Sequence, residues 1–145
     1  EFRRVLFRSI MASNINEFDR ELKVFAQVIV PNAHLNVVKK VATEALRSVV
    51  NKTPVDTGRA RSNWMTALNT IPSETVELTA DLTREQASAV SITRGLGVID
   101  SAQPFTTISI ANNLPYIGVL EYGGSKQAPE GMVRVTLAEL EAMFA

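Results

Sequence analysis

The chain has 145 residues, 46% of them hydrophobic and 21% charged, a composition typical of one soluble globular domain. It holds no Cys and a single His, which excludes disulfides, thiolate metal sites, a Cys nucleophile and a metal site built from several His side chains. No run of about 18 apolar residues occurs, so the sequence predicts no membrane-spanning helix.

The first ten residues, EFRRVLFRSI, differ from the rest because they are basic and apolar without a clear period. We expect residues 1–10 to be a non-native leader, with Met11 as the natural start and 11–145 as a single domain. A signal peptide is the weaker alternative, since Arg8 interrupts any apolar core. Residues 11–145 carry 12 basic and 14 acidic side chains, and this net charge of −2 disfavours tight binding to nucleic-acid phosphates.

Two long helices are predicted at the N-terminal end. Ser13 or Asn14 is expected to cap the first, whose apolar face carries Phe18, Leu22, Phe25 and Val28. Pro31 is expected to interrupt this helix because proline lacks the N–H donor and disfavours helical geometry before it. The second helix, over about 32–51, has apolar residues spaced by three and four, and Pro54 ends it.

Strand patterns follow. RSNWMTALN and SETVELTAD alternate in polarity and predict two strands, with Pro72-Ser73 as the hairpin turn between them. PFTTISIAN predicts a third strand. Because strands follow one another along the chain, we expect an α+β fold in which the two N-terminal helices, with further short helices, pack a small antiparallel sheet.

Three further helices complete the prediction. TREQASAVSITRGLGV is expected to begin with a capping box between Thr83 and Gln86 and to end at Gly95 or Gly97. LPYIGVLEYGG predicts a short helix with Gly123 after its end, and MVRVTLAELEAMF predicts the last one.

Residues 56–58, Asp-Thr-Gly, are the tripeptide of aspartic proteases, and the YIG at residues 116–118 weakly resembles the second motif of those enzymes. A retroviral-type dimeric protease using Asp56 is therefore one alternative. The context opposes it, because two carboxylates that share a proton need shielding at the end of a buried strand. Arg59 and Arg61 would instead favour the ionised carboxylate.

A turn between the second helix and a strand accounts for the same residues better. Pro54 stops the helix, Asp56 is expected to accept backbone N–H groups, and Gly58 is expected to take a positive φ. Arg59 and Arg61 would then point to one side of the emerging strand.

The remaining single features have structural interpretations. The Gly-Leu-Gly at 95–97 lacks the Lys and Ser/Thr of a phosphate loop, so we expect it to end a helix. His34 is expected on the surface. Trp64 is expected in the core, with an interface anchor as the alternative. The loop from Asn112 to Met132 holds two Tyr and paired glycines, which suit either a protein–protein contact or a structural turn.

Two stretches, TPVDTGRARSNW after a long helix and NNLPYIGVLEYGGSKQAPEGMVR some fifty residues later, resemble the neck and tail-component proteins of long-tailed bacteriophages. The resemblance spans roughly residues 22–140. The positions that match the two motifs of that family are Pro54, Val55, Asp56, Thr57, Gly58, Arg61, Trp64, Asn112, Pro115, Tyr116, Glu121, Tyr122 and Gly123.

This resemblance implies a structural virion protein rather than an enzyme, without cofactors and assembled in the host cytoplasm. Such proteins resemble subunits of a ring at the head–tail junction, here expected to be a hexamer, through which the double-stranded genome passes. The expected neighbours are stopper or connector proteins and tail-tube proteins, with no membrane. A tail terminator and an accessory neck protein both remain open, and a generic protein-interaction module is the alternative outside phages.

A ring needs contacts between neighbouring subunits that close on themselves. The residues expected to make these contacts lie in the two motif regions and are Asp56, Arg59, Arg61, Tyr116, Glu121, Tyr122 and Lys126.

Overall fold

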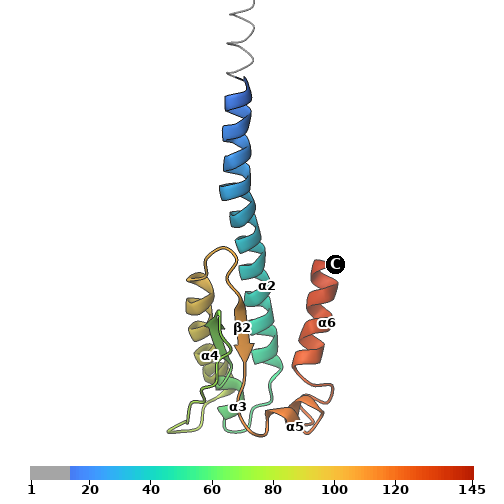
Figure 1. Cartoon of the computed structure of the whole chain (residues 1–145). Coiled ribbons are helices and arrows are strands. Elements are labelled where there is room, and N and C mark those ends of the chain that lie inside the picture. Colours follow the sequence, from blue (N-terminus) through green and yellow to red (C-terminus); the bar gives the residue numbers. More distant parts are fainter. Residues whose placement is uncertain (1–13) are drawn as a thin grey trace, which may run out of the picture.

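A computed structural model describes residues 14–145, so the expected leader, the Met11 start and the Ser13 cap lie outside the described residues. The dominant element is one long helix over residues 14–52 (Figure 1). It contains a π-helical turn, η1 (Phe25–Ile29), and ends as α2 (Val30–Lys52). The predicted pair of N-terminal helices is therefore a single continuous helix.

The predicted break at Pro31 is wrong because the helix adjusts its geometry just before the proline. The N–H of Val30 donates to the carbonyl oxygen of Phe25, five residues earlier, instead of the usual four. This wider turn makes room for a proline ring that would clash with the preceding turn of a regular α-helix. Pro31 itself is buried.

After α2 the chain reverses through residues 53–58. Gly58 has φ +85°, as predicted, and begins the one-turn helix α3 (Arg59–Ser62). The strand β1 (Met65–Leu68) starts only after this helix, so the prediction that Arg59 and Arg61 emerge on a strand is wrong.

The two-stranded antiparallel sheet joins β1 to β2 (Ile108–Ala111), with Met65 opposite Ala111 and Leu68 opposite Ile108. The predicted strand SETVELTAD and its hairpin turn at Pro72-Ser73 are wrong. That segment is held by a side chain instead of a strand. Asn63 accepts the Val76 N–H at 2.6 Å and donates to the Val76 carbonyl oxygen at 2.9 Å.

Helix α4 (Arg84–Asp100) begins with the predicted capping box, in which Thr83 and Gln86 exchange side-chain and backbone hydrogen bonds. Its predicted end at Gly95 or Gly97 is wrong, since the helix runs on to Asp100. Gly95 is required by packing rather than capping. A Cβ at that position would collide with the side chain of Leu46 in α2.

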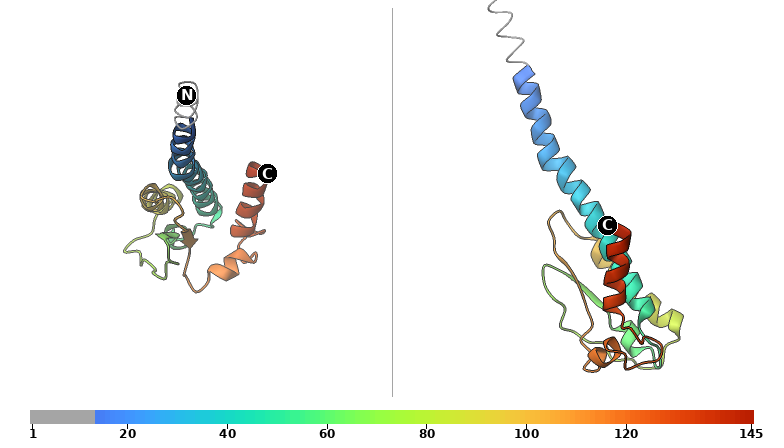
Figure 2. Two further views of the ribbon diagram at one scale, coloured as in Figure 1. Left: turned by 45° about the horizontal axis from the view of Figure 1, so that its top comes forward. Right: turned by 90° about the vertical axis from the view of Figure 1, so that its right-hand side faces the viewer.

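The short helix α5 (Ile117–Glu121) is followed by Gly123 at φ +86°, as predicted. The last helix is α6 (Val133–Phe144). Helix α2 lies between α4 and α6, an arrangement visible in Figures 1 and 2. A mainly helical chain with one small antiparallel sheet confirms the predicted α+β class.

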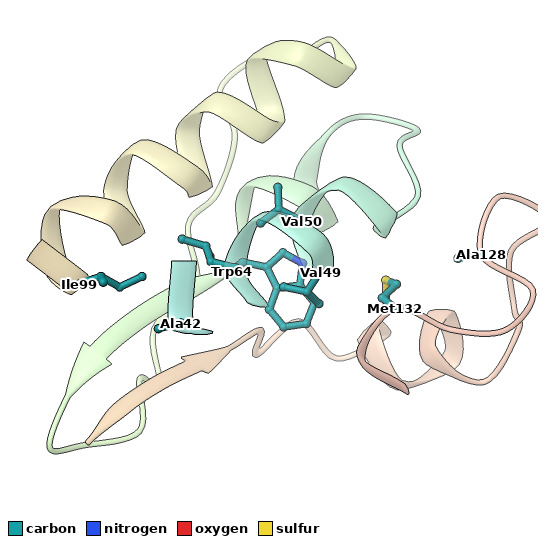
Figure 3. Close-up of a cluster of buried hydrophobic side chains, with 8 residues drawn as sticks. Ala42, Val49, Val50, Trp64, Ile99, Ala128 and Met132 are labelled. Atoms are coloured by element: carbon teal, nitrogen blue, oxygen red, sulfur yellow. The ribbon is translucent and has the colours of Figure 1, made fainter. Parts of the chain in front are cut away.

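The core lies where α2, α4, β1 and the segment before α6 meet. Trp64 is only 5% exposed, which confirms its predicted place in the core and removes it as an exposed anchor. Figure 3 shows its indole ring among buried side chains from these elements. The cluster consists of Ala42, Leu46, Val49, Val50, Trp64, Ile99, Ala128 and Met132.

Candidate functional site

The turn after α2 is built around Thr53, which is fully buried. Its hydroxyl donates to the Val49 carbonyl oxygen at 2.7 Å and accepts the indole N–H of Trp64 at 2.8 Å. The polar edge of the core tryptophan is thus satisfied by the residue that ends the helix. A side-chain hydrogen bond therefore joins the first and last residues of the first sequence motif, Thr53 and Trp64.

Arg61 lies inside this closed turn. Its side chain is directed at the end of α2, where Nη2 donates to the Asn51 carbonyl oxygen at 2.8 Å and Nε donates to that of Thr53 at 2.9 Å. Nη1 donates to the Ser88 hydroxyl of α4 at 3.0 Å. Burial lowers the pKa of Arg61, and the neighbouring Arg84 lowers it further. Arg61 is 3% exposed, so it supports the site from within and is not displayed on it.

Arg59 points the other way. It forms an ion pair with Glu77, whose side chain is 72% exposed. This pair ties α3 to the extended segment that Asn63 also holds. Surface ion pairs of this kind contribute little to stability, and the Arg59 side chain is 35% exposed.

The second sequence motif lies against the first. Gln127 accepts the Val55 N–H at 3.1 Å and donates to the Val55 carbonyl oxygen at 3.0 Å, as a neighbouring strand would. Asn112 donates to the Ala60 carbonyl oxygen at 2.8 Å. These amide side chains join segments that are 52 and 72 residues apart in the sequence.

A surface cavity of about 310 Å³ lies at this junction, and we call it the turn–loop cavity. It brings together three of the predicted contact residues, Asp56, Arg59 and Tyr116. Its other lining residues are Pro54, Val55, Thr57, Gly58, Ala60, Leu120, Gly124, Ser125 and Gln127.

Glu121 has a structural role at the start of α6. Its carboxylate accepts the backbone N–H groups of Met132 and Val133, both at 2.8 Å, and that of Arg134 at 3.1 Å. Burial raises the pKa of Glu121, but these N–H groups and the Arg134 side chain outweigh burial, so the net pKa is below its usual value. A carboxylate at a helix N-terminus satisfies orphan donors and the helix dipole together.

Tyr122 and Lys126 remain on the surface. Tyr122 is 80% exposed, and the guanidinium of Arg134 lies 5.3 Å from its ring centroid. It lines a second cavity, of about 350 Å³, beside Glu121 and Val133, while the exposed Lys126 lines neither cavity. The predicted contact residues therefore divide into a displayed group, Asp56, Arg59, Tyr116, Tyr122 and Lys126, and the internal supports Arg61 and Glu121.

Asp56 does not make the expected turn contacts. Its side chain is exposed, and no hydrogen bond or ion pair to its carboxylate occurs within residues 14–145. It lies between α2 and α3, not at the end of a buried strand. The shielding that a shared carboxylate proton requires is therefore missing around Asp56 in this chain.

Sequence reasoning missed the residues that join the two motifs. The side-chain amides of Gln127 and Asn63 bond the backbone of Val55 and Val76 as the backbone of a neighbouring strand would. No local sequence pattern predicts these hydrogen bonds. His34 is exposed as predicted, and its ring stacks on Phe105 with centroids 5.4 Å apart.

Neither a metal centre nor a membrane span is found in the part of the chain that the structure describes. Residues 14–145 contain no group of three or more His, Asp or Glu side chains that could hold a metal ion. Over the same residues, no helix combines the length and apolar character needed to cross a bilayer. No known protein family, curated protein or solved structure matches this chain.

Proposed function

We propose that this chain is a structural subunit of a ring at the head–tail junction of a long-tailed bacteriophage, acting in virion assembly rather than in catalysis. The observation that carries the proposal is the junction of the two motifs that resemble phage neck proteins. They meet through the Gln127–Val55 and Asn112–Ala60 hydrogen bonds and enclose one surface cavity. A shared structural unit gives a physical reason for the two motifs to occur together.

The displayed residues around this junction are the proposed subunit contacts. Asp56, Arg59 and Tyr116 line the turn–loop cavity, and Tyr122, which is 80% exposed, lines the second cavity. Exposed tyrosines on a loop with little conformational freedom suit protein–protein contacts, since they bury large area at low entropic cost. Heterologous contacts form a ring when the rotation between neighbouring subunits closes, and we expect that ring to be a hexamer.

The ring would lie between stopper or connector proteins and tail-tube proteins, with the double-stranded genome passing through its lumen. The charge balance supports transient passage rather than retention. Residues 11–145 carry a net charge of −2, and a strongly basic lumen would hold DNA through counterion release.

Binding to neck and tail proteins tests this role. The chain should bind the connector or tail-tube proteins encoded beside it, measured by biolayer interferometry. Tyr122→Ala should weaken this binding at least about tenfold, as expected for an aromatic residue central to a contact. Glu74→Ala, an exposed change away from the cavity, is the control. Wild-type chain that binds neither protein, and neighbouring genes without phage functions, would favour a generic interaction module instead.

A further inference from the structure

The long helix carries an apolar stripe that no described residue covers. Its first part stands clear of the other elements in every view (Figures 1 and 2), and all side chains from 14 to 30 are exposed. The same stretch also exposes Val24, Val28 and Ile29, and we call six residues of the stripe the helix seam. They are Ile15 (63% exposed), Phe18 (65%), Leu22 (51%), Phe25 (52%), Val30 (43%) and Val37 (58%).

The seam follows one line along the helix. Its first four residues are spaced by three, four and three, which is the heptad spacing of a coiled coil. Val30 comes five residues after Phe25, and it stays on the same face because its N–H bonds the Phe25 carbonyl oxygen across the π-turn. Val37 lies seven residues after Val30 and therefore on the same face. The π-turn thus keeps the apolar residues before and after Pro31 on one face of the helix.

The seam is separate from the face of α2 that builds the core. That face buries Ala42, Leu46 and Val49, which belong to a different heptad phase. Continuing the seam beyond Val37 by three and seven residues leads to Lys40 and Glu44, which are charged. The apolar line therefore ends where the helix joins the folded body, at Lys40, whose ammonium lies 5.8 Å from the centroid of the Phe144 ring of α6.

The exposed area is large enough for a stable contact with another helix. Half-exposed apolar side chains of this size present on the order of 100 Å² each, so the seam exposes on the order of 600 Å². Two seams together would bury on the order of 1,200 Å², the lower bound of stable protein interfaces. Single apolar residues on a surface need no explanation, whereas contiguous apolar patches larger than a few hundred Å² mark interaction sites.

The flanking side chains permit a parallel pairing of two copies. In a parallel, in-register pair, each residue flanking the seam on one side faces the residue five positions later in the other helix. Asn14 would then face Asp19, and Glu21 would face Ala26. No like charges oppose each other at these positions. Within each helix, Asp19 already pairs with Lys23 at 2.7 Å.

We infer that the helix seam binds the same seam of a second copy of this chain, as a parallel, in-register pair of helices. The contact uses residues 15–37 and is independent of the turn–loop cavity and of the proposed phage role. The partner of the seam is thus inferred from the heptad spacing and apolar character of the seam, without reference to neighbouring genes.

Disulfide trapping tests the pairing and its direction, because these 145 residues contain no cysteine. Leu22→Cys should form a disulfide-linked dimer under mild oxidation, since parallel helices place the two copies of a seam position face to face. Arg20→Cys, on the opposite side of the helix, should remain largely monomeric on the same non-reducing gel. Equal crosslinking of the two variants would overturn the contact. Preferential linkage of position 22 to position 18 or 25 of a second chain would overturn the parallel direction.

A charge in the seam gives a second test with a fold control. Leu22→Lys in the full chain should raise the dimer dissociation constant at least about tenfold in sedimentation equilibrium, because two ammonium groups would face each other in an apolar contact. Emission of the only Trp, Trp64, should not change, since it is buried in the body. An unchanged dissociation constant would overturn the inference, as would a Tyr122→Ala chain, in which the proposed ring contacts are weakened, that forms no dimers at micromolar concentration. Binding to connector or tail-tube proteins through Tyr122 would be unaffected, so a failure here is distinguishable from failure of the proposed function.

Discussion

Arg61 donates to the carbonyl oxygen of Thr53 from both Nε, at 2.9 Å, and Nη2, at 2.5 Å. Because the same guanidinium also bonds the Asn51 carbonyl oxygen, it satisfies acceptors that the end of α2 would otherwise leave unpaired. The tripeptide that resembles a protease motif therefore begins a turn that an internal arginine closes. These residues join one helix to the next, and Asp56 and Thr57 are exposed at the surface.

Replacing Arg61 with Ala should lower the free energy of unfolding by about 2–4 kcal/mol, since buried carbonyl oxygens would lose a charged donor. Arg61→Lys should recover only part of this loss, because an ammonium group cannot reproduce the planar fork. Urea unfolding followed by Trp64 fluorescence gives the values.

Arg59→Ala is the matched control for this prediction. Its ion pair with Glu77 lies at the surface, so the loss should stay below about 1 kcal/mol. Equal losses for the two arginines would show that the buried network around Thr53 does not stabilise the fold as described.

Two glycines of α4 should respond in opposite directions to alanine. Gly95→Ala should destabilise the protein by about 1–3 kcal/mol, because its Cβ would collide with Leu46 and approach the Thr66 hydroxyl to 2.8 Å. Gly97 has open space around it within the same helix, so Gly97→Ala should stabilise by about 0.5–1 kcal/mol. Thermal or urea unfolding of both variants checks this, and a stabilising Gly95→Ala would contradict the packing of α4 on α2.

Glu121 should make the free energy of unfolding depend on pH in the acid range. Its carboxylate is stabilised in the folded protein, so its folded pKa lies below the unfolded value of about 4.3. The stabilisation is fully present above that unfolded value and is lost as the pH falls through the folded pKa. Above about pH 5, Glu121→Gln should therefore cost about 1–2 kcal/mol, and this difference should disappear at lower pH.

The comparison between wild type and Glu121→Gln isolates this group. The Lys52 side chain also lowers the pKa of Glu139, but Glu139 is common to both proteins and cancels in the difference. Urea unfolding at a series of pH values from 3 to 7 measures it. A difference that stays constant across that range would contradict the assigned role of the carboxylate at the start of α6.

Tyr122 should affect assembly without affecting folding. It is 80% exposed, so Tyr122→Ala should change the free energy of unfolding by no more than about 0.5 kcal/mol. The same variant should weaken association with neighbouring subunits, which mass photometry over a range of concentrations detects. A clear loss of stability with unchanged association would assign Tyr122 to the fold instead.

Local patterns predicted the elements whose signals are local. The capping box of α4 needs only Thr83 and Gln86, and the left-handed turn after α5 needs only Gly123. The position of Trp64 in the core also followed from its residue type. The α+β class followed from the strand patterns, because the predicted strands at 61–69 and 104–112 contain β1 and β2.

The errors arose where distant residues decide the structure. Residues 73–81 have a strand pattern, yet the side chain of Asn63 occupies the edge that a strand would pair with. Gly95 is typical of a helix end, yet Leu46 of another helix requires a glycine there. The joining of the two motifs depends on Gln127, 72 residues from its partner Val55, which no local pattern indicates.

The oligomeric state of the full chain tests the central claim most directly. Native mass spectrometry at micromolar concentration, with the helix seam blocked by Leu22→Lys so that only the ring contacts act, should show one discrete closed assembly, expected to be a hexamer, and adding Tyr122→Ala should shift it toward smaller species. A strictly monomeric wild-type chain over the whole concentration range would contradict the proposal that this protein builds a ring.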